Sequence, residues 1–113
     1  MPCIQLSTSA KLSNDKQEAL KKQFGKAIEL LPRKSEKWLM CVFRPDTDIF
    51  FQGERGDIAF LEVDVFGTLD REACDALTVR LMEIVNTELG ISQEKIYIKF
   101  GQTPIWGWNG NNF

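Results

Sequence analysis

The hydrophobic and polar positions of the chain form two similar units, each predicting a strand, a helix and a strand. The first unit opens with segment 3–7, whose alternating apolar residues share one face. Polar residues 13–15 offer N-cap chemistry before a helix that Pro32 ends. An apolar strand over 38–43 follows. The apolar positions of the helix fall on one stripe at helical spacing: Leu20, Phe24, Ala27, Ile28 and Leu31.

The second unit repeats this order. Segment 58–66 alternates apolar and polar residues, and 67–70 supply a turn and a helix cap. A second helix ends at Gly90, which suits the position just after a helix, and 96–100 alternate again as a strand. The apolar stripe of this helix comprises Leu77, Leu81, Ile84, Val85 and Leu89.

Two β-α-β units predict an α+β fold, a two-layer sandwich in which one sheet carries both helices on one side. The length of 113 residues indicates a single domain over 1–113. The linker 45–56 reads as a loop with a short strand around 49–51, and the tail 106–110 is aromatic and rich in turn residues. Exposed aromatic residues of this kind mark an interface or a ligand pocket, so we expect an oligomer. The sheet face opposite the helices is polar, with Gln5, Ser7, Glu62, Asp64, Tyr97 and Lys99.

Composition narrows the function classes. The net charge is −2 without a basic cluster, so we expect neither a nucleic acid nor an anionic membrane as partner. The longest apolar run, 38–43, is far shorter than the ~20 residues of a membrane span. We expect no classical secretion signal, because polar residues interrupt the N-terminal segment. The three cysteines are widely spaced and the chain has no His, so we expect no metal and no cofactor.

Pro2 directly follows Met1, and it is the candidate acid–base group. Removal of Met1 would leave a secondary amine held rigidly on a ring. An α-amino group titrates near ~8, and partial burial or a nearby cation lowers its pKa toward neutrality. A base with such a pKa suits proton transfer at ambient pH. Met-Pro starts also arise by chance, since Pro makes up about 5% of residues, so Pro2 acquires meaning only from the rest of the chain.

The chain resembles the macrophage migration inhibitory factor family, the N-terminal-proline tautomerases, over essentially its whole length. The features that carry the resemblance are Pro2, Lys34 before a strand, Gly67 after one, the segment 96–98 (Ile-Tyr-Ile), and a Gly-Trp-Asn-Gly motif in a tail ending at Phe113. The resemblance implies a homotrimer whose three sheets form a barrel with the helices outside. It also implies that the active sites lie between subunits.

The resemblance assigns roles to individual residues. Pro2 matches the catalytic base, Lys34 the lysine that contacts the substrate carboxylate, and Tyr97 a catalytic tyrosine from the adjacent subunit. Phe66 matches a residue whose backbone N–H faces the substrate. The remaining substrate-binding positions are Trp38, Lys99, Trp106, Trp108 and Phe113.

The chain departs from the mammalian members at several of these positions. Those proteins carry Asn at the site of Lys99, Ile at the site of Phe66 and a smaller apolar residue at the site of Trp106. The differences imply a narrower and more cationic pocket. The mammalian cytokine also has a CxxC pair where this chain has Ile58 and Leu61, so we expect no thiol–disulfide activity.

The implied function is an isomerase, a keto–enol tautomerase of phenylpyruvate-like 2-keto acids, with dopachrome-type compounds as related substrates. The alternative is a secreted cytokine that acts on a host receptor and in which the pocket is secondary. A housekeeping trimer with another natural substrate is the third reading. We expect a cytoplasmic protein, exported without a signal peptide under the cytokine reading. Without the resemblance, Lys34 reads as a solvated loop charge, and Trp106 and Trp108 as interface aromatics.

Overall fold

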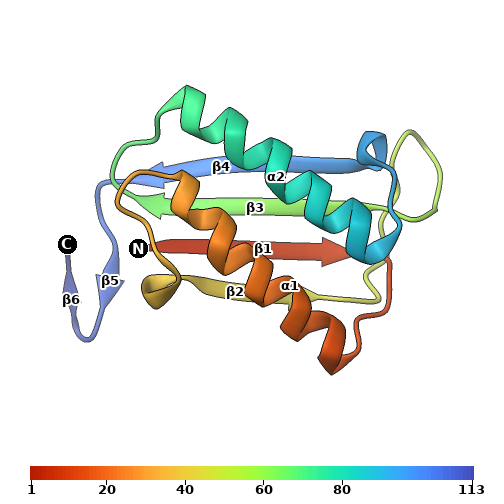
Figure 1. Ribbon diagram of the computed structural model, residues 1–113, viewed down its shortest axis with the longest axis horizontal. Helices are drawn as coiled ribbons and strands as arrows, with labels where there is room; N and C mark the ends of the chain where they lie inside the picture. The colour runs from red at the N-terminus through yellow and green to blue at the C-terminus, as the bar shows by residue number, and fades with distance from the viewer.

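A four-stranded sheet covered on one face by two helices forms the body of the protein (Figure 1). The structure is a computed structural model that describes residues 1–113. The strands lie in the order β2-β1-β3-β4. The elements are β1 (Pro2–Thr8), α1 (Asn14–Ala27), β2 (Met40–Arg44), β3 (Ala59–Phe66), α2 (Arg71–Leu89), β4 (Ile96–Thr103), and a terminal hairpin of β5 (Gly107–Trp108) and β6 (Asn111–Asn112). Three short 3₁₀ helices complete them: η1 (Ile28–Leu30), η2 (Glu36–Trp38) and η3 (Gln93–Lys95).

The strand pairing confirms the predicted duplication. Strand β1 pairs in parallel with β2, and β3 pairs in parallel with β4, so each unit is a β-α-β crossover. The two units meet at the centre of the sheet, where β1 and β3 run antiparallel with Pro2 opposite Val65 and Thr8 opposite Ala59. This register brings the start of β1 and the ends of β3 and β4 to the same edge of the molecule (Figure 1).

The hydrophobic core lies between the sheet and the helices. Burial alternates strictly along β1 and β3, as expected for strands with one face packed against helices. The predicted helix stripes point into this core: Leu20, Phe24, Leu77 and Leu81 are fully buried. The Phe24 ring stacks on the Phe43 ring at a centroid distance of 6.1 Å, which fastens α1 to β2.

The predicted caps at the start of both helices and at the end of the second helix are also confirmed. The Ser13 hydroxyl accepts a hydrogen bond from the Lys16 backbone N–H at 3.1 Å, and the Asp70 carboxylate accepts one from the Ala73 N–H at 2.9 Å. Gly90 ends α2 in the left-handed conformation at φ 68°, which glycine adopts without steric cost.

Three predicted element boundaries are wrong. The first helix stops at Ala27 and continues as η1 to Leu30, because the residue before Pro32 avoids helical backbone angles and the last turn tightens. The strand predicted over 38–43 begins only at Met40, since Trp38 belongs to η2. Segment 49–51 contains no strand apart from a single bridge between Phe51 and Glu54, which close a two-residue turn with positive φ at both central residues.

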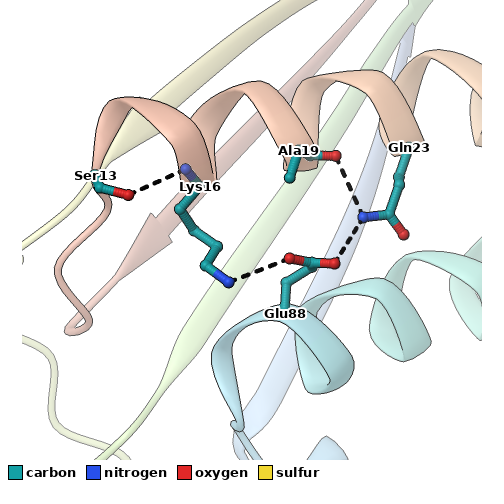
Figure 2. Close-up of polar contacts among 5 residues, drawn as sticks. All are labelled: Ser13, Lys16, Ala19, Gln23 and Glu88. Carbon is teal, nitrogen blue, oxygen red and sulfur yellow. Dashed lines mark hydrogen bonds and ion pairs between the residues drawn. The ribbon is translucent and has the colours of Figure 1, made fainter.

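A polar contact joins the two helices on their outer side (Figure 2). Glu88 of α2 accepts hydrogen bonds from Gln23 at 3.0 Å and from Lys16 at 3.2 Å, both on α1. These bonds, with that of Gln23 the larger cause, lower the pKa of the Glu88 carboxyl. The contact aligns the helices across the sheet and lies away from its Pro2 edge. Neither helix is long and apolar enough to traverse a lipid bilayer.

Candidate active site

The chain begins inside the sheet, at the edge where β3 ends. Pro2 is buried, and it is the first residue of β1, opposite Val65 of β3. Because the sheet pairing holds its backbone, a prolyl nitrogen at this position has a fixed place next to Phe66. A rigid amine in a partly dry environment is what the predicted catalytic base requires.

A tight turn presents Lys34 to the same edge. The Lys34 N–H donates to the Leu31 carbonyl at 3.2 Å, with Pro32 and Arg33 in the central positions. Pro32 at the second position and a positive φ of 62° at Arg33 are the features of a type II turn. The Lys34 Nζ then donates to the Phe66 carbonyl at 3.1 Å, so the ammonium is anchored at the end of β3. Lys34 and Pro2 therefore lie at the same edge of the sheet, and the role of Lys34 toward a substrate carboxylate stays a prediction.

Met1 contacts both Phe66 and Lys34 at this edge of the sheet. Its carbonyl accepts a hydrogen bond from the Phe66 N–H at 3.1 Å, the same N–H that the resemblance assigns to the substrate. Its terminal amine has a pKa below the ordinary 8.0, firstly because of burial and secondly because of the positive charge and hydrogen bonding of Lys34. A chain that retains Met1 thus blocks the Phe66 N–H and converts the Pro2 nitrogen into an amide.

A cavity of about 300 Å³ opens beside Lys34. One wall is the turn that carries Lys34, and the other is the loop between β3 and α2. Gly67 makes this loop possible, with φ 100° immediately after Phe66. The lining residues are Leu31, Pro32, Arg33, Lys34, Phe66, Gly67, Thr68, Leu69 and Asp70.

Four aromatic rings run from Phe66 away from this cavity, and we call them the aromatic wall: Phe66, Phe113, Trp108 and Trp38. The Phe66 and Phe113 centroids are 5.9 Å apart, and Phe113 stacks on Trp108 at 6.4 Å. Trp38 meets Trp108 edge-on at 5.2 Å. Such edge-on and stacked pairs are favourable ring geometries, and three of the four rings were predicted to bind substrate through their side chains.

The terminal hairpin holds the wall together. Asn109 and Gly110 both have positive φ, at 52° and 81°, and form the two-residue turn between β5 and β6. This is a type I′ geometry, for which Asn-Gly is the preferred sequence. The Phe113 N–H then donates to the Trp106 carbonyl at 2.9 Å. Trp106, which was predicted to bind substrate, is half-buried and positions Phe113 through this backbone bond.

Two predicted site residues lie elsewhere in the same chain. Tyr97 pairs with Phe60, five residues along β3 from the partner of Pro2, which is about 17 Å in a strand. Its ring packs edge-on against Phe51 at 4.8 Å. Lys99 pairs with Glu62, and its ammonium lies 3.4 Å from the Glu62 carboxylate. One chain alone therefore does not bring Tyr97 or Lys99 to Pro2.

The cysteines do not supply a nucleophile at this edge. Burial, followed by the negative charge of Asp64, raises the pKa of the Cys3 thiol. Burial also raises the pKa of Cys41 to about 11. Both thiols stay protonated at neutral pH.

Some residues at this edge were not predicted. Sequence patterns did not indicate the Met1 carbonyl bond, the loop residues Thr68 and Leu69 in the cavity wall, or Lys37, whose ammonium lies 5.3 Å from the Trp38 ring centroid. The proximity of Lys37 to Lys34 along the chain was the one available signal.

The fold and the site define a class of protein: a duplicated β-α-β sandwich with its N-terminal residue beside a lysine and an aromatic wall. The family model of macrophage migration inhibitory factor matches residues 1–113. The chain belongs to the macrophage migration inhibitory factor family. No curated protein sequence matches it. Family membership supports a tautomerase-type function in general terms.

Solved structures agree with this family. Leishmania major MIF2 is similar, with 31% identity over 100% of this chain and 97% of that chain, at a TM-score of 0.94. The macrophage migration inhibitory factor homologue of Prochlorococcus marinus has 28% identity over 98% of both chains, at a TM-score of 0.88. Pt0534, solved after inactivation by 2-oxo-3-pentynoate, shares the fold at a TM-score of 0.79 and 14% identity, over 89% of this chain and 85% of that chain.

Proposed function

We propose that this protein is a keto–enol tautomerase of phenylpyruvate-like 2-keto acids, with the Pro2 nitrogen as general acid and base. One observation carries the proposal: the Lys34 ammonium is held at the end of β3, where it helps to lower the pKa of the Met1 terminal amine, and a prolyl amine exposed one residue later would meet the same cation. An ammonium next to a neutral amine is suited to hold a carboxylate beside a base. An anion-binding ammonium and an amine base at one sheet edge favour a reaction in which a proton is transferred close to the carboxylate of the substrate.

The proposed step conserves protons within the substrate. The neutral Pro2 nitrogen takes a proton from C3 of the keto acid, and the C–H electrons form the C2–C3 double bond. The carbonyl electrons move to oxygen, and the prolyl ammonium returns the proton to that oxygen. Lys34 binds the carboxylate and stabilises the negative charge that develops on the enolate.

The aromatic wall supports an aromatic side chain on the substrate. Phe113 and Trp108 offer ring faces and edges next to the Phe66 end of the cavity, where the reacting carbons would lie. A substrate ring gains from such contacts through burial and ring geometry. The inactivator of Pt0534, 2-oxo-3-pentynoate, is itself a 2-keto acid, which is the class proposed here.

The test is the ketonisation of enol-phenylpyruvate, followed by the loss of the enol absorbance. We expect the purified protein to accelerate it, provided that the intact mass shows that Met1 has been removed. A sample that lacks Met1, is folded and matches the buffer rate would refute the proposal. A sample that retains Met1 is expected to be inactive and serves as the negative control.

We also propose that the site is completed in a homotrimer. Tyr97 is 62% exposed, and the side chains around it form an apolar hollow of about 230 Å³ with Phe50 and Phe60. The edge strands β2 and β4 are each unpaired on their outer side in one chain, and open sheet edges invite pairing with another copy. In such an assembly, the Tyr97 of one subunit would lie next to the Pro2 of a neighbouring subunit. Within one chain these two residues are too far apart to meet.

Mixed subunits test this arrangement. We expect a solution mass of three times the 12.9 kDa chain by light scattering. We also expect that Pro2→Gly and Tyr97→Ala, each nearly inactive, regain activity when co-refolded, because some sites then combine an intact Pro2 with an intact Tyr97. Separately refolded samples mixed without exchange are the control. A monomer in solution, or a co-refolded mixture no more active than its parents, would contradict the shared site.

A further inference from the structure

We propose that Lys37 determines substrate specificity by binding a second acidic group at the far end of the aromatic wall. The substrate class is then an aromatic 2-keto acid that carries another anionic group on its ring. This inference rests on the proposed function, because it extends the same site. The established family match does not address Lys37, which belongs to η2 and lies outside the lining of the cavity.

The contacts place a cation at each end of one continuous apolar surface. At one end Lys34 bonds to the carbonyl of Phe66, the first ring of the wall. At the other end the Lys37 ammonium lies 5.3 Å from the centroid of Trp38, the last ring. The two lysines are three positions apart along the chain, which limits their Cα atoms to about 11 Å apart. A single aromatic diacid can therefore span the distance between flexible lysine side chains.

The Trp38 ring keeps the Lys37 ammonium at the wall. A cation within about 6 Å of a tryptophan face is attracted by the ring quadrupole. Trp38 is itself fixed by the edge contact with Trp108, at an angle of 84° between the ring planes. Lys37 thus places a positive charge beside the last ring of the wall, in a short helix that also carries this ring.

No carboxylate of the chain neutralises this charge. The segment 33–37 holds three cations, Arg33, Lys34 and Lys37, and the ion pairs of the structure all involve other residues. The acidic residue between them, Glu36, directs its carboxylate against Gly25 of α1. Asp70, across the cavity, accepts the N-cap hydrogen bond of α2. The positive charge at this rim is therefore available to an anionic ligand.

The experiment compares two substrates, phenylpyruvate and 4-carboxyphenylpyruvate, with the wild type and Lys37→Gln. We expect the variant to lower the ratio of kcat/KM for the carboxylated substrate over phenylpyruvate by about three- to fivefold, the size of one exposed ion pair. High salt is expected to reduce the wild-type ratio as well, since ions screen exposed charges. Lys22→Gln, on the exposed side of α1, is the matched control and keeps the ratio.

Binding of non-reacting ligands separates this inference from the proposed function. Calorimetry with 3-phenylpropionate and 3-(4-carboxyphenyl)propionate needs no turnover, and we expect Lys37→Gln to weaken only the preference for the diacid. An equal preference in wild type and Lys37→Gln would overturn the inference even if turnover is normal. An Arg33→Gln variant that loses as much preference as Lys37→Gln would also overturn it, since the effect would then be diffuse charge. If the protein shows no turnover but wild type still prefers the diacid and Lys37→Gln does not, the proposed tautomerase function is refuted and the inference about Lys37 stands.

Discussion

Replacing Pro2 by Gly lowers kcat/KM for ketonisation of enol-phenylpyruvate by about 10²–10⁴-fold, the usual contribution of a positioned acid–base group. Glycine keeps a free N-terminal amine, but that amine is primary and lacks the ring that fixes its direction. Pro2 is buried in β1, and its backbone pairs with β3. The variant can therefore form the same strand and lose only the placement and basicity of the nitrogen.

Cys3→Ala is the control for this result. Cys3 is adjacent to Pro2, half-buried, and has a raised thiol pKa, so it is neither an available nucleophile nor a base. We expect Cys3→Ala to retain the wild-type rate. Steady-state kinetics, with intact mass to confirm the loss of Met1 from every sample, measure both variants. A folded Pro2→Gly protein with the wild-type rate would exclude Pro2 as the base.

Replacing Lys34 by Gln lowers kcat/KM by about 10²–10³-fold, the effect of removing one group that stabilises developing negative charge. The same change alters the pH profile. Lys34 is the second cause, after burial, of the lowered pKa of the Met1 terminal amine, and we expect its charge to act in the same direction on the prolyl amine that removal of Met1 exposes. Without its charge, the pKa of the amine rises. The base acts in its neutral form, so activity is lost as the pH falls through that pKa, and the acid limb of the variant moves to higher pH.

A pH–rate profile of kcat/KM measures this shift, because it reports the free enzyme. Lys34→Arg is the informative second variant. It keeps the positive charge and should hold the midpoint of the acid limb closer to the wild type than Lys34→Gln does, although its planar head differs in shape. An unchanged midpoint in Lys34→Gln would show that Lys34 does not act on the base. The midpoint of thermal unfolding of each variant, compared with that of the wild type, measures how far loss of the hydrogen bond to the Phe66 carbonyl destabilises the fold.

The regular elements of the fold could be predicted from local patterns. Period-two alternation located β1, β3 and β4, and the helical stripe through Leu77 and Leu81 located α2. Ser13, Asp70 and Gly90 marked the helix ends, because each satisfies backbone groups by chemistry within a few residues. These signals depend on neighbours along the chain, so a sequence can carry them.

The boundaries that failed depend on contacts further away. Trp38 has the hydrophobicity of a strand residue, yet its ring packs on Trp108, seventy positions later, and its backbone forms η2. Phe50 and Phe51 likewise resemble a strand, but the turn at Gln52 and Gly53 closes too soon for one. The hydrophobicity of such residues predicts that they are buried, but the surface against which they pack is determined by the tertiary structure.

The candidate site divides in the same way. The resemblance to a family indicated Pro2, Lys34 and Phe66, and these lie together at the end of β3. Their roles in catalysis stay predictions until the variants above are measured. The Met1 carbonyl on the Phe66 N–H was not predictable, because a backbone bond between residues 65 positions apart leaves no mark on either residue type.

By itself the sequence determined the two β-α-β units, the helix caps, the absence of His, and Pro2 as the only early candidate for a base, since these follow from residue types and short spacings. The tertiary structure decided which groups meet. It paired β1 with β3 so that the N-terminal amine lies beside Lys34, and it assembled the aromatic wall from residues 38, 66, 108 and 113. It also separated Tyr97 from Pro2 within one chain. Sheet register and ring packing are long-range, and only the folded chain settles them.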